Sequence, residues 1–446
     1  MAEGDGSPAE PGLPHGFRTG TRPLGTRPGA WHLDVYVRDV SLAPYRWVVL
    51  AAGTLAQASF SASSVGLPAL GPALKSEYGL TLGETGVVLA AIGIGMLFTL
   101  LPWGLVADRI DERWVIATGL TGAAALLVVA SRTHGFGTVT AALVGVGALG
   151  ASVNAASGRA IMAWFPAGEL GLALGIRQTA IPIGAAIGAG FLPLLASAGG
   201  TRLAFVFLAA ACAAGAVVAA VFIRTGAPTE PELGDVSRPV RDPRMWLLGT
   251  STGLYLVAQI AIISFVVLFL HEHRNVSTHA AALVLVAIYV LAVAARIGSG
   301  TISDRLGNRL LPLRTIGIAL TIFTAGVAAA TDAPLALLIP LFIVTGMLSM
   351  AWNGLAYAAA EAAGSARTGA ALGFQQTLLG VVVAGAPPIL AAVAEHSWRL
   401  AFFLAALAPA VGVLVLQKLR QPARSPRRAR TRGTSATLPA ARRTPD

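Results

Sequence analysis

The sequence is short of charged and aromatic residues. Charged residues make up 12% of its 446 positions and aromatic residues 7%, whereas 55% are hydrophobic and the mean hydropathy is +0.71. This balance excludes a set of soluble domains. The high content of Gly and Ala suits helices that approach one another closely in lipid. The composition therefore predicts that lipid is the solvent for most of the chain.

Cysteine and histidine are too scarce or too poorly spaced for a disulfide or a metal site. Cys212 is the only cysteine, which excludes an intrachain disulfide and a thiol-based metal site. Among the seven histidines, only His271 and His273 have a ligand-like spacing, and we expect both to be solvated in a loop. We predict no metal and no cofactor.

Long apolar segments are abundant instead. A bilayer-spanning helix needs roughly 20 mostly apolar residues, and twelve candidates occur. They lie near 46–67, 84–105, 114–131, 137–160, 170–195, 201–223, 245–270, 279–301, 312–330, 334–358, 368–393 and 399–417. The fold class predicted is an all-α integral membrane protein of twelve transmembrane helices in two pseudo-symmetric six-helix bundles.

Polar segments divide the chain into five parts. Residues 1–44 lack the apolar core of a signal peptide and are predicted to be a flexible leader. The bundles are predicted at 45–223 and 245–417, joined by a charged, Pro-containing linker at 224–244. The tail at 418–446 holds nine Lys and Arg residues against Asp446. We expect this tail to meet anionic lipid headgroups and not nucleic acid, which would require a basic folded surface.

The two halves repeat one another. Residues 81–113 align without a gap on residues 277–309, and 174–179 align on 372–377. Repeats of this length indicate a duplicated structural unit, and duplicated membrane halves are typical of transporters. Lys and Arg are concentrated in the loops on one side of this arrangement, which predicts a plasma-membrane protein with both termini in the cytoplasm.

One motif occurs at the end of the second span of each half. Gly104, Asp108, Arg109 and Arg113 recur as Gly300, Asp304, Arg305 and Arg309. This pattern resembles the signature loop of the major facilitator superfamily, with the resemblance covering about 45–417. The resemblance implies that these eight residues form a cytoplasmic gate, in which the acids lie near helix N-termini and the glycines permit close helix approach. The first copy departs from the pattern by having Asp111 where the second has Gly307.

Polar residues within the spans are the best guide to a transport pathway, because lipid penalises them. Arg177 and Arg296 lie deep in the fifth and eighth spans, and amides occupy matching positions in both halves. Tyr255 and Trp352 are expected to supply apolar walls. The predicted substrate-binding residues are Arg177, Arg296, Gln57, Gln178, Gln259, Gln375, Gln376, Asn154, Asn353 and Tyr357. For Asn154 and Asn353, a plain interhelical hydrogen bond is an equal alternative.

No Asp or Glu lies in the middle of a span, so a carboxylate proton carrier is missing, with Glu361 at an inner helix end as the nearest substitute. Two intramembrane cations favour a carrier of a small organic or inorganic anion, working by alternating access as a monomer, with a coupling proton as a further partner. A proton-coupled drug or metabolite efflux pump and a transport-inactive sensor remain alternatives. A membrane enzyme would need an intramembrane nucleophile, acid pair or metal cluster, and the sequence shows none.

Overall fold

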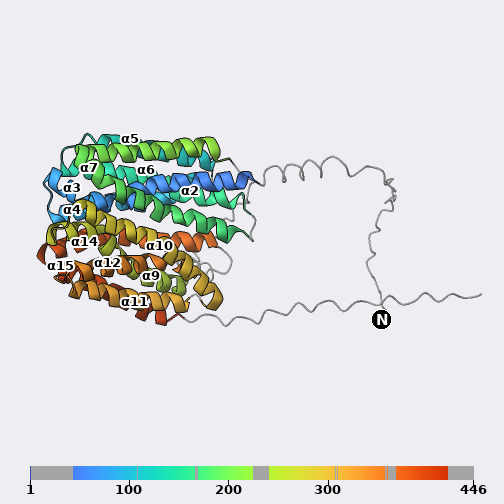
Figure 1. The fold of residues 1–446 in the computed structure, drawn as a ribbon. Helices are drawn as coiled ribbons and strands as arrows, with labels where there is room; N and C mark the ends of the chain where they lie inside the picture. The colour runs from blue at the N-terminus through green and yellow to red at the C-terminus, as the bar shows by residue number, and fades with distance from the viewer. Residues whose placement is uncertain are drawn as a thin grey trace, which may run out of the picture. The chain divides into compact units, whose positions relative to one another are not determined.

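Fourteen helical elements follow one another in the computed structural model, and its described residues form no strand (Figure 1). The described residues are 1, 44–107, 109–165, 169–224, 241–306, 308, 310–356, 359 and 368–419. The leader, the middle of the linker and all but the start of the tail therefore lie outside them, and the predicted domain boundaries stay predictions. We call the described residues up to 224 the N-terminal half and those from 241 the C-terminal half.

The N-terminal half begins with α2 and ends with a helix twice the usual length. Its elements are α2 (Tyr45–Ser64), η1 (Leu67–Leu70), α3 (Gly71–Tyr78), α4 (Leu82–Ala107), α5 (Glu112–Ala130), α6 (Phe136–Met162) and α7 (Leu170–Phe222). The C-terminal half contains α9 (Pro243–Leu268), η2 (Phe269–His273), α10 (Thr278–Leu306), α11 (Leu310–Ala329), α12 (Leu335–Ala351), α14 (Thr368–His396) and α15 (Trp398–Gln417).

Eleven helices of the described chain are long and apolar enough to cross a membrane. One of them, α7, is two spans in succession, because its backbone is non-helical at Gly199 and Gly200, where Gly200 has φ +67°. Glycine tolerates this left-handed geometry. The two parts double back, since Gly184 and Gly215, on either side of the break, both pack against α2. The structure thus has the twelve spans predicted from the sequence.

The sequence missed one short helix. Residues 71–78 contain Lys75 and Glu77 and were expected to be loop, but they form α3. Pro72 lies in the first turn, where the missing N–H breaks no helical bond, and Gly79 ends the helix at φ +63°. The error arose because hydropathy alone was used to locate helix ends, whereas a proline start and a glycine stop marked this helix.

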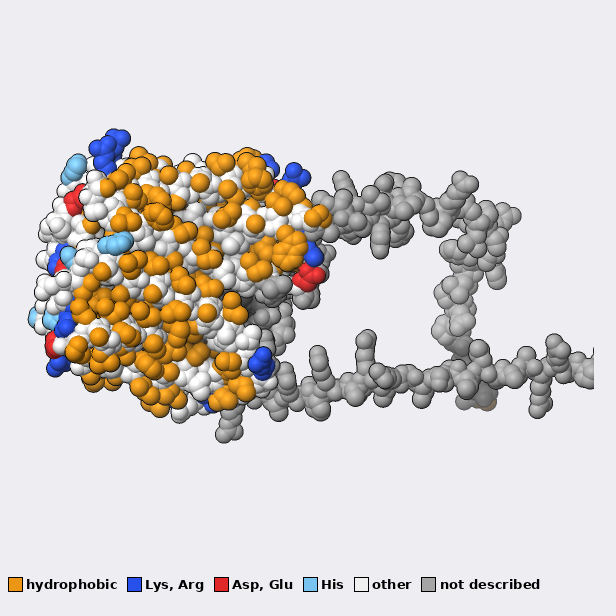
Figure 2. All heavy atoms as spheres, in the orientation of Figure 1, with side chains coloured by type: hydrophobic (Ala, Val, Ile, Leu, Met, Phe, Trp, Pro, Cys, Tyr) orange, Lys and Arg blue, Asp and Glu red, His pale blue; other side chains and the backbone are white. Residues whose placement is uncertain are grey.

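The surface is apolar between two charged ends. In Figure 2, hydrophobic side chains cover the middle of the visible face, while Lys, Arg, Asp, Glu and His gather at its two ends. Large apolar side chains such as Phe98, Leu101 and Ile322 are 72%, 70% and 63% exposed. A patch of this extent on a soluble protein would cause association, but it matches the hydrocarbon region of a bilayer.

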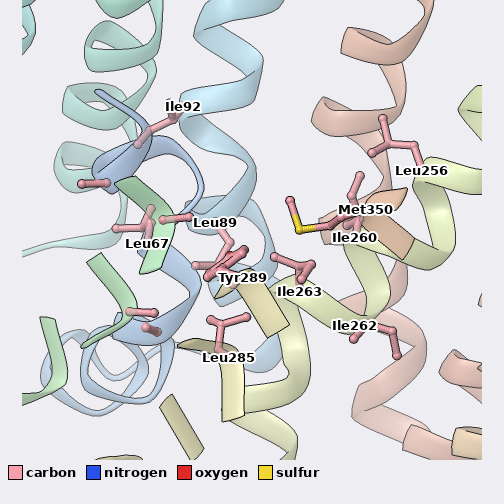
Figure 3. Packing of buried hydrophobic residues seen from close by; sticks show 14 of the residues in the cluster. Leu67, Leu89, Ile92, Leu256, Ile260, Ile262, Ile263, Leu285, Tyr289 and Met350 are labelled. Atoms are coloured by element: carbon pink, nitrogen blue, oxygen red, sulfur yellow. The ribbon is translucent and has the colours of Figure 1, made fainter. Parts of the chain in front are cut away.

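The two halves pack together through α4 against α14 and through α7 against α10. Buried residues from both sides belong to one cluster: Figure 3 shows Leu67, Leu89 and Ile92 of the N-terminal half together with Tyr289 and Ile263 of the C-terminal half. The contact is close because Gly residues face it. A methyl group added at Gly93 would lie 2.4 Å from Val383 Cγ1, so the Val383 side chain packs directly against the backbone of α4.

Candidate functional site

Arg177 is held by three helices of the N-terminal half. From α7, its Nε donates to Ser157 Oγ on α6 at 2.9 Å, and its Nη2 donates to Gln57 Oε1 on α2 and to the carbonyl of Asn154 on α6, both at 3.3 Å. The side chain is half-buried. These bonds fix the guanidinium group in one orientation, as a preorganised anion site requires.

Arg296 lies on α10 and reaches into both halves. Its Nε donates to the carbonyl of Met350 at 3.1 Å, and its Nη1 donates to the carbonyl of Gln178 at 3.3 Å. Arg296 follows the start of α10 at Thr278 by 18 residues, which at 1.5 Å per residue is about 27 Å. The Met350 carbonyl is one residue from the end of α12, where helix carbonyls lack intrahelical partners.

The amides of the C-terminal half donate three further hydrogen bonds. Asn353 Nδ2 donates to Gln259 Oε1 at 3.4 Å and to the Met350 carbonyl at 3.1 Å, so it shares an acceptor with Arg296. Gln375 Nε2 donates to Thr252 Oγ1 at 3.3 Å. The Gln375 side chain is fully buried, and its Oε1 has no hydrogen-bond partner among the described residues.

The structure thus brings most of the predicted site residues together in two groups. Arg177 and Gln57 form the N-terminal group, while Arg296, Asn353 and Gln259 form the C-terminal group. The two groups meet at α7, because the carbonyl that accepts from Arg296 belongs to the residue after Arg177. Gln178 takes part through its backbone, as does Asn154, and Gln376 is half-buried on α14 beside Gln375. Tyr357 lies outside the described residues.

Tyr255 and Trp352, which are expected to supply apolar walls, pack in the core of the C-terminal half in this conformation, and their role as pathway walls stays a prediction. Both side chains are fully buried, and their rings pack edge to face with centroids 6.2 Å apart. Tyr255 also donates to the Leu313 carbonyl at 3.3 Å. Whether such a ring lines a pathway or packs in a core depends on the rotation of its helix, which the sequence pattern does not specify.

Sequence reasoning also missed three partners of the arginines and amides. Ser157 lies three residues after Asn154 and therefore shares its helix face, which was a usable signal. Thr252 lies seven residues before Gln259, again on one face of α9. The Met350 carbonyl had no side-chain signal, because a backbone acceptor is present at every residue and only the end of α12 distinguishes it.

The predicted gate residues that the structure describes form no recorded hydrogen bond or ion pair with the opposite half. Arg109 and Arg305 are exposed, and a methyl group at Gly104 or Gly300 would meet no described atom within 4 Å. Asp108, Arg309 and the side chain of Asp304 lie outside the described part of the chain. We call this side of the molecule the Arg109 end.

Asp111 and Arg113 have local roles beside this loop. The Asp111 side chain accepts from the Arg113 N–H at 3.0 Å and caps the start of α5, which explains the departure of the first motif copy. The Arg113 guanidinium group lies over the Trp114 ring, 4.5 Å from its centroid. The structural role of Asp111 is therefore to cap the N-terminus of α5.

The opposite side of the molecule, which we call the Lys75 end, is tied together across the halves. Lys75 Nζ on α3 pairs with Glu272 Oε2 on η2 at 2.8 Å. The Gly83 N–H in the first turn of α4 donates to Glu395 Oε1 near the end of α14 at 2.7 Å. Tyr289 on α10 donates to the Val65 carbonyl at 2.7 Å. Apart from the Arg296–Gln178 bond, these are the hydrogen bonds between the halves for which both partners are described.

Comparison with known proteins places the chain in a family. The family model for the Major Facilitator Superfamily matches residues 50–387. An uncharacterized MFS-type transporter of Mycobacterium tuberculosis is 29% identical over 357 residues, which are 79% of this chain and 80% of the relative. A probable sulfoacetate transporter, SauU of Cupriavidus necator, is 28% identical over 155 residues, which are 33% of this chain and 34% of that protein.

Solved structures share the fold. A bacterial homolog of the human lysosomal transporter Spinster superimposes with a TM-score of 0.67 at 16% identity, covering 84% of this chain and 95% of that one. A mutant of the nucleoside transporter NupG gives 0.66 at 16% identity, covering 83% and 99%. Twelve spans, two similar halves and these matches agree: the chain belongs to the Major Facilitator Superfamily and is an integral membrane secondary transporter, not an enzyme.

Proposed function

We propose that this transporter carries a small organic or inorganic anion across the plasma membrane. The observation that supports the proposal is that arginines from both halves meet at one stretch of α7. The Arg177 side chain projects from this stretch, and Arg296 donates to the carbonyl of the next residue, Gln178. An Arg within a membrane helix costs up to about 2.5–3.5 kcal/mol in insertion measurements, the value for the helix centre. Two such residues at one site indicate a function that needs positive charge.

The acceptors around the arginines favour this interpretation. The hydrogen bonds given above go to neutral oxygens, namely a hydroxyl, an amide and three carbonyls. A carboxylate or sulfonate accepts a stronger, charge-assisted bond from guanidinium than a neutral oxygen does. The amides of Gln57, Gln259 and Asn353 would then bind the remaining polar atoms of the substrate. One relative is a probable sulfoacetate transporter, and sulfoacetate is an anion of this kind.

The contacts between the halves support alternating access as the mechanism. Lys75, Gly83 and Val65 are bonded across the halves at the Lys75 end, whereas Arg109 and Gly104 are open at the other. The excess of Lys and Arg in the loops at the Arg109 end supports a cytoplasmic location for that end and for both termini. The conformation is then inward-facing, and rocking of the halves would close the Arg109 end and open the Lys75 end.

Thermal stabilisation of the purified protein by ligands tests the proposal. The panel contains acetate, sulfate and sulfoacetate, with lipophilic cations as a second set. We expect an anion to raise the melting temperature of the wild type but not of Arg177→Gln or Arg296→Gln, because each variant removes a cationic contact. Flux of the stabilising anion into proteoliposomes then separates a carrier from a transport-inactive sensor.

Arg274→Gln is the matched control. Arg274 is also half-buried and also donates to two carbonyls, those of Thr331 and Ala333, but it lies at the Lys75 end. Its loss should lower the melting temperature without abolishing the anion effect. Stabilisation by lipophilic cations alone, unchanged in Arg177→Gln and Arg296→Gln, would reject the anion proposal in favour of an efflux pump.

A further inference from the structure

A proline in α7 leaves one backbone carbonyl open at the proposed site. Pro182 lies inside the helix, and proline has no N–H to donate to the carbonyl four residues earlier. That carbonyl belongs to Gln178. An unpaired carbonyl in a membrane interior is unfavourable, so another donor is needed there.

Arg296 of the opposite half supplies this donor. Its Nη1 donates to the Gln178 carbonyl at 3.3 Å while its Nε remains on the Met350 carbonyl of its own half. Both acceptors are carbonyls that the helix backbone leaves open, one at the end of α12 and one four residues before Pro182. Arg296 thereby links the two halves near the middle of the molecule.

The internal repeat shows that this link can form only once. The position equivalent to Arg296 in α4 is Leu100, and the position equivalent to Pro182 in α14 is Gly380. The Leu100 side chain has no hydrogen-bond donor, and Gly380 has a backbone N–H that can pair with the carbonyl four residues earlier. The donor in the C-terminal half and the open acceptor in the N-terminal half are thus both departures from the symmetry of the fold.

We propose that Pro182 is a positioning residue, which acts by opening the Gln178 carbonyl so that it holds Arg296 across the halves until an anionic substrate replaces it as the acceptor. The proposal rests on the anion-binding role of Arg296. A carboxylate or sulfonate is a stronger acceptor than the Gln178 carbonyl, so binding of the substrate breaks the hydrogen bond between α10 and α7. The empty inward-facing state is stabilised by the link, and this stabilisation competes with anion binding.

Pro182→Ala tests the link, because alanine restores the N–H and lets the helix satisfy Gln178 by itself. We expect the dissociation constant of the anion that stabilises the wild type best, among acetate, sulfate and sulfoacetate, to fall about 3- to 10-fold, since a competing acceptor is lost. Pro182→Ser restores the same N–H and should act alike. Pro193→Ala is the control, because Pro193 also lies inside α7 but opens the carbonyl of Ala189, which is not one of the two carbonyls that accept from Arg296 above.

A second measurement needs no ligand. The measurement is a double-mutant cycle followed by melting temperature. Arg296→Gln should be more destabilising in the wild-type background than in the Pro182→Ala background, because only the wild-type background then leaves the Gln178 carbonyl without a donor. Additive effects, together with an unchanged dissociation constant in both Pro182 variants, would overturn the link and leave the anion site intact. Coupling in the cycle without binding of any anion would support the link and reject the proposed substrate class.

Discussion

Removing charge at the Lys75 end should open that end. Glu395 accepts the Gly83 N–H at the start of α4, and Lys75 pairs with Glu272, so both contacts exist only while the halves are closed there. The double variant Lys75→Gln with Glu395→Gln keeps the side-chain lengths similar and removes both charges. The equilibrium should shift toward the state in which the Lys75 end is open.

The structure sets the size of this shift. A carboxylate at a helix N-terminus contributes about 0.3–1 kcal/mol, and a partly exposed ion pair about 0.2–1 kcal/mol. Lys75 and Glu272 are 28% and 27% exposed and Glu395 is exposed, so solvent screening applies to both. The contacts share no partner and should add, giving about 0.5–2 kcal/mol, or about a 2- to 30-fold change in population.

Thiol labelling measures the populations, because Cys212 is the only cysteine and is buried. In a Cys212→Ala background, Ala69→Cys reports the Lys75 end, since Ala69 is fully buried on η1, which packs against α9 of the other half. Gly300→Cys reports the Arg109 end. The double variant should speed labelling at 69 and slow it at 300 by similar factors.

A matched carboxylate provides the control. Glu84 is also in the first turn of α4, but its Oε2 accepts from Thr81 within the same half. Glu84→Gln should destabilise the helix start without changing the ratio of the two labelling rates. Equal labelling ratios in the wild type and the Lys75–Glu395 double variant would refute the assignment of these contacts as a closure of this end.

Two further changes test the contact between the halves. Gly86→Ala would place a methyl group 2.5 Å from Ala391 Cβ; it should destabilise the closed Lys75 end by about 1–3 kcal/mol and speed labelling there, whereas Gly137→Ala, which meets no atom within 4 Å, should not. Asp108→Asn should favour the inward-facing state and preserve ligand binding, because it weakens the proposed cytoplasmic gate; unchanged labelling at both ends would contradict that role.

The spans were predictable because they depend on short stretches of sequence. All twelve predicted segments overlap a helix, and the structure begins the second span at Leu82 and ends it at Ala107, near the predicted 84–105. Hydrocarbon thickness sets the length of each apolar run. The duplication of the signature loop then indicated the family before any contact was known.

The sequence predicted several polar residues that lie together but few of their contacts, and their role in binding a substrate stays a prediction. Arg177, Gln57, Asn353 and Gln259 do engage one another as two groups, because equivalent positions of a repeat lie at equivalent places in each half. Which groups these side chains bind depends on helix rotation and tilt, which hydropathy does not specify. Ser157 was missed for that reason.

The sequence by itself determined the twelve spans, the two similar halves and the presence of arginines within them, since each follows from local composition or from repetition. The tertiary structure alone decided which end of the molecule is closed and that Arg296 reaches the opposite half. Both depend on how the two halves are rotated against each other, and the same sequence must permit more than one such rotation if it is to transport. Pro182 shows both contributions. The sequence alone tells that it has no N–H for the Gln178 carbonyl, but only the packing of the two halves brings Arg296 to that carbonyl as the donor.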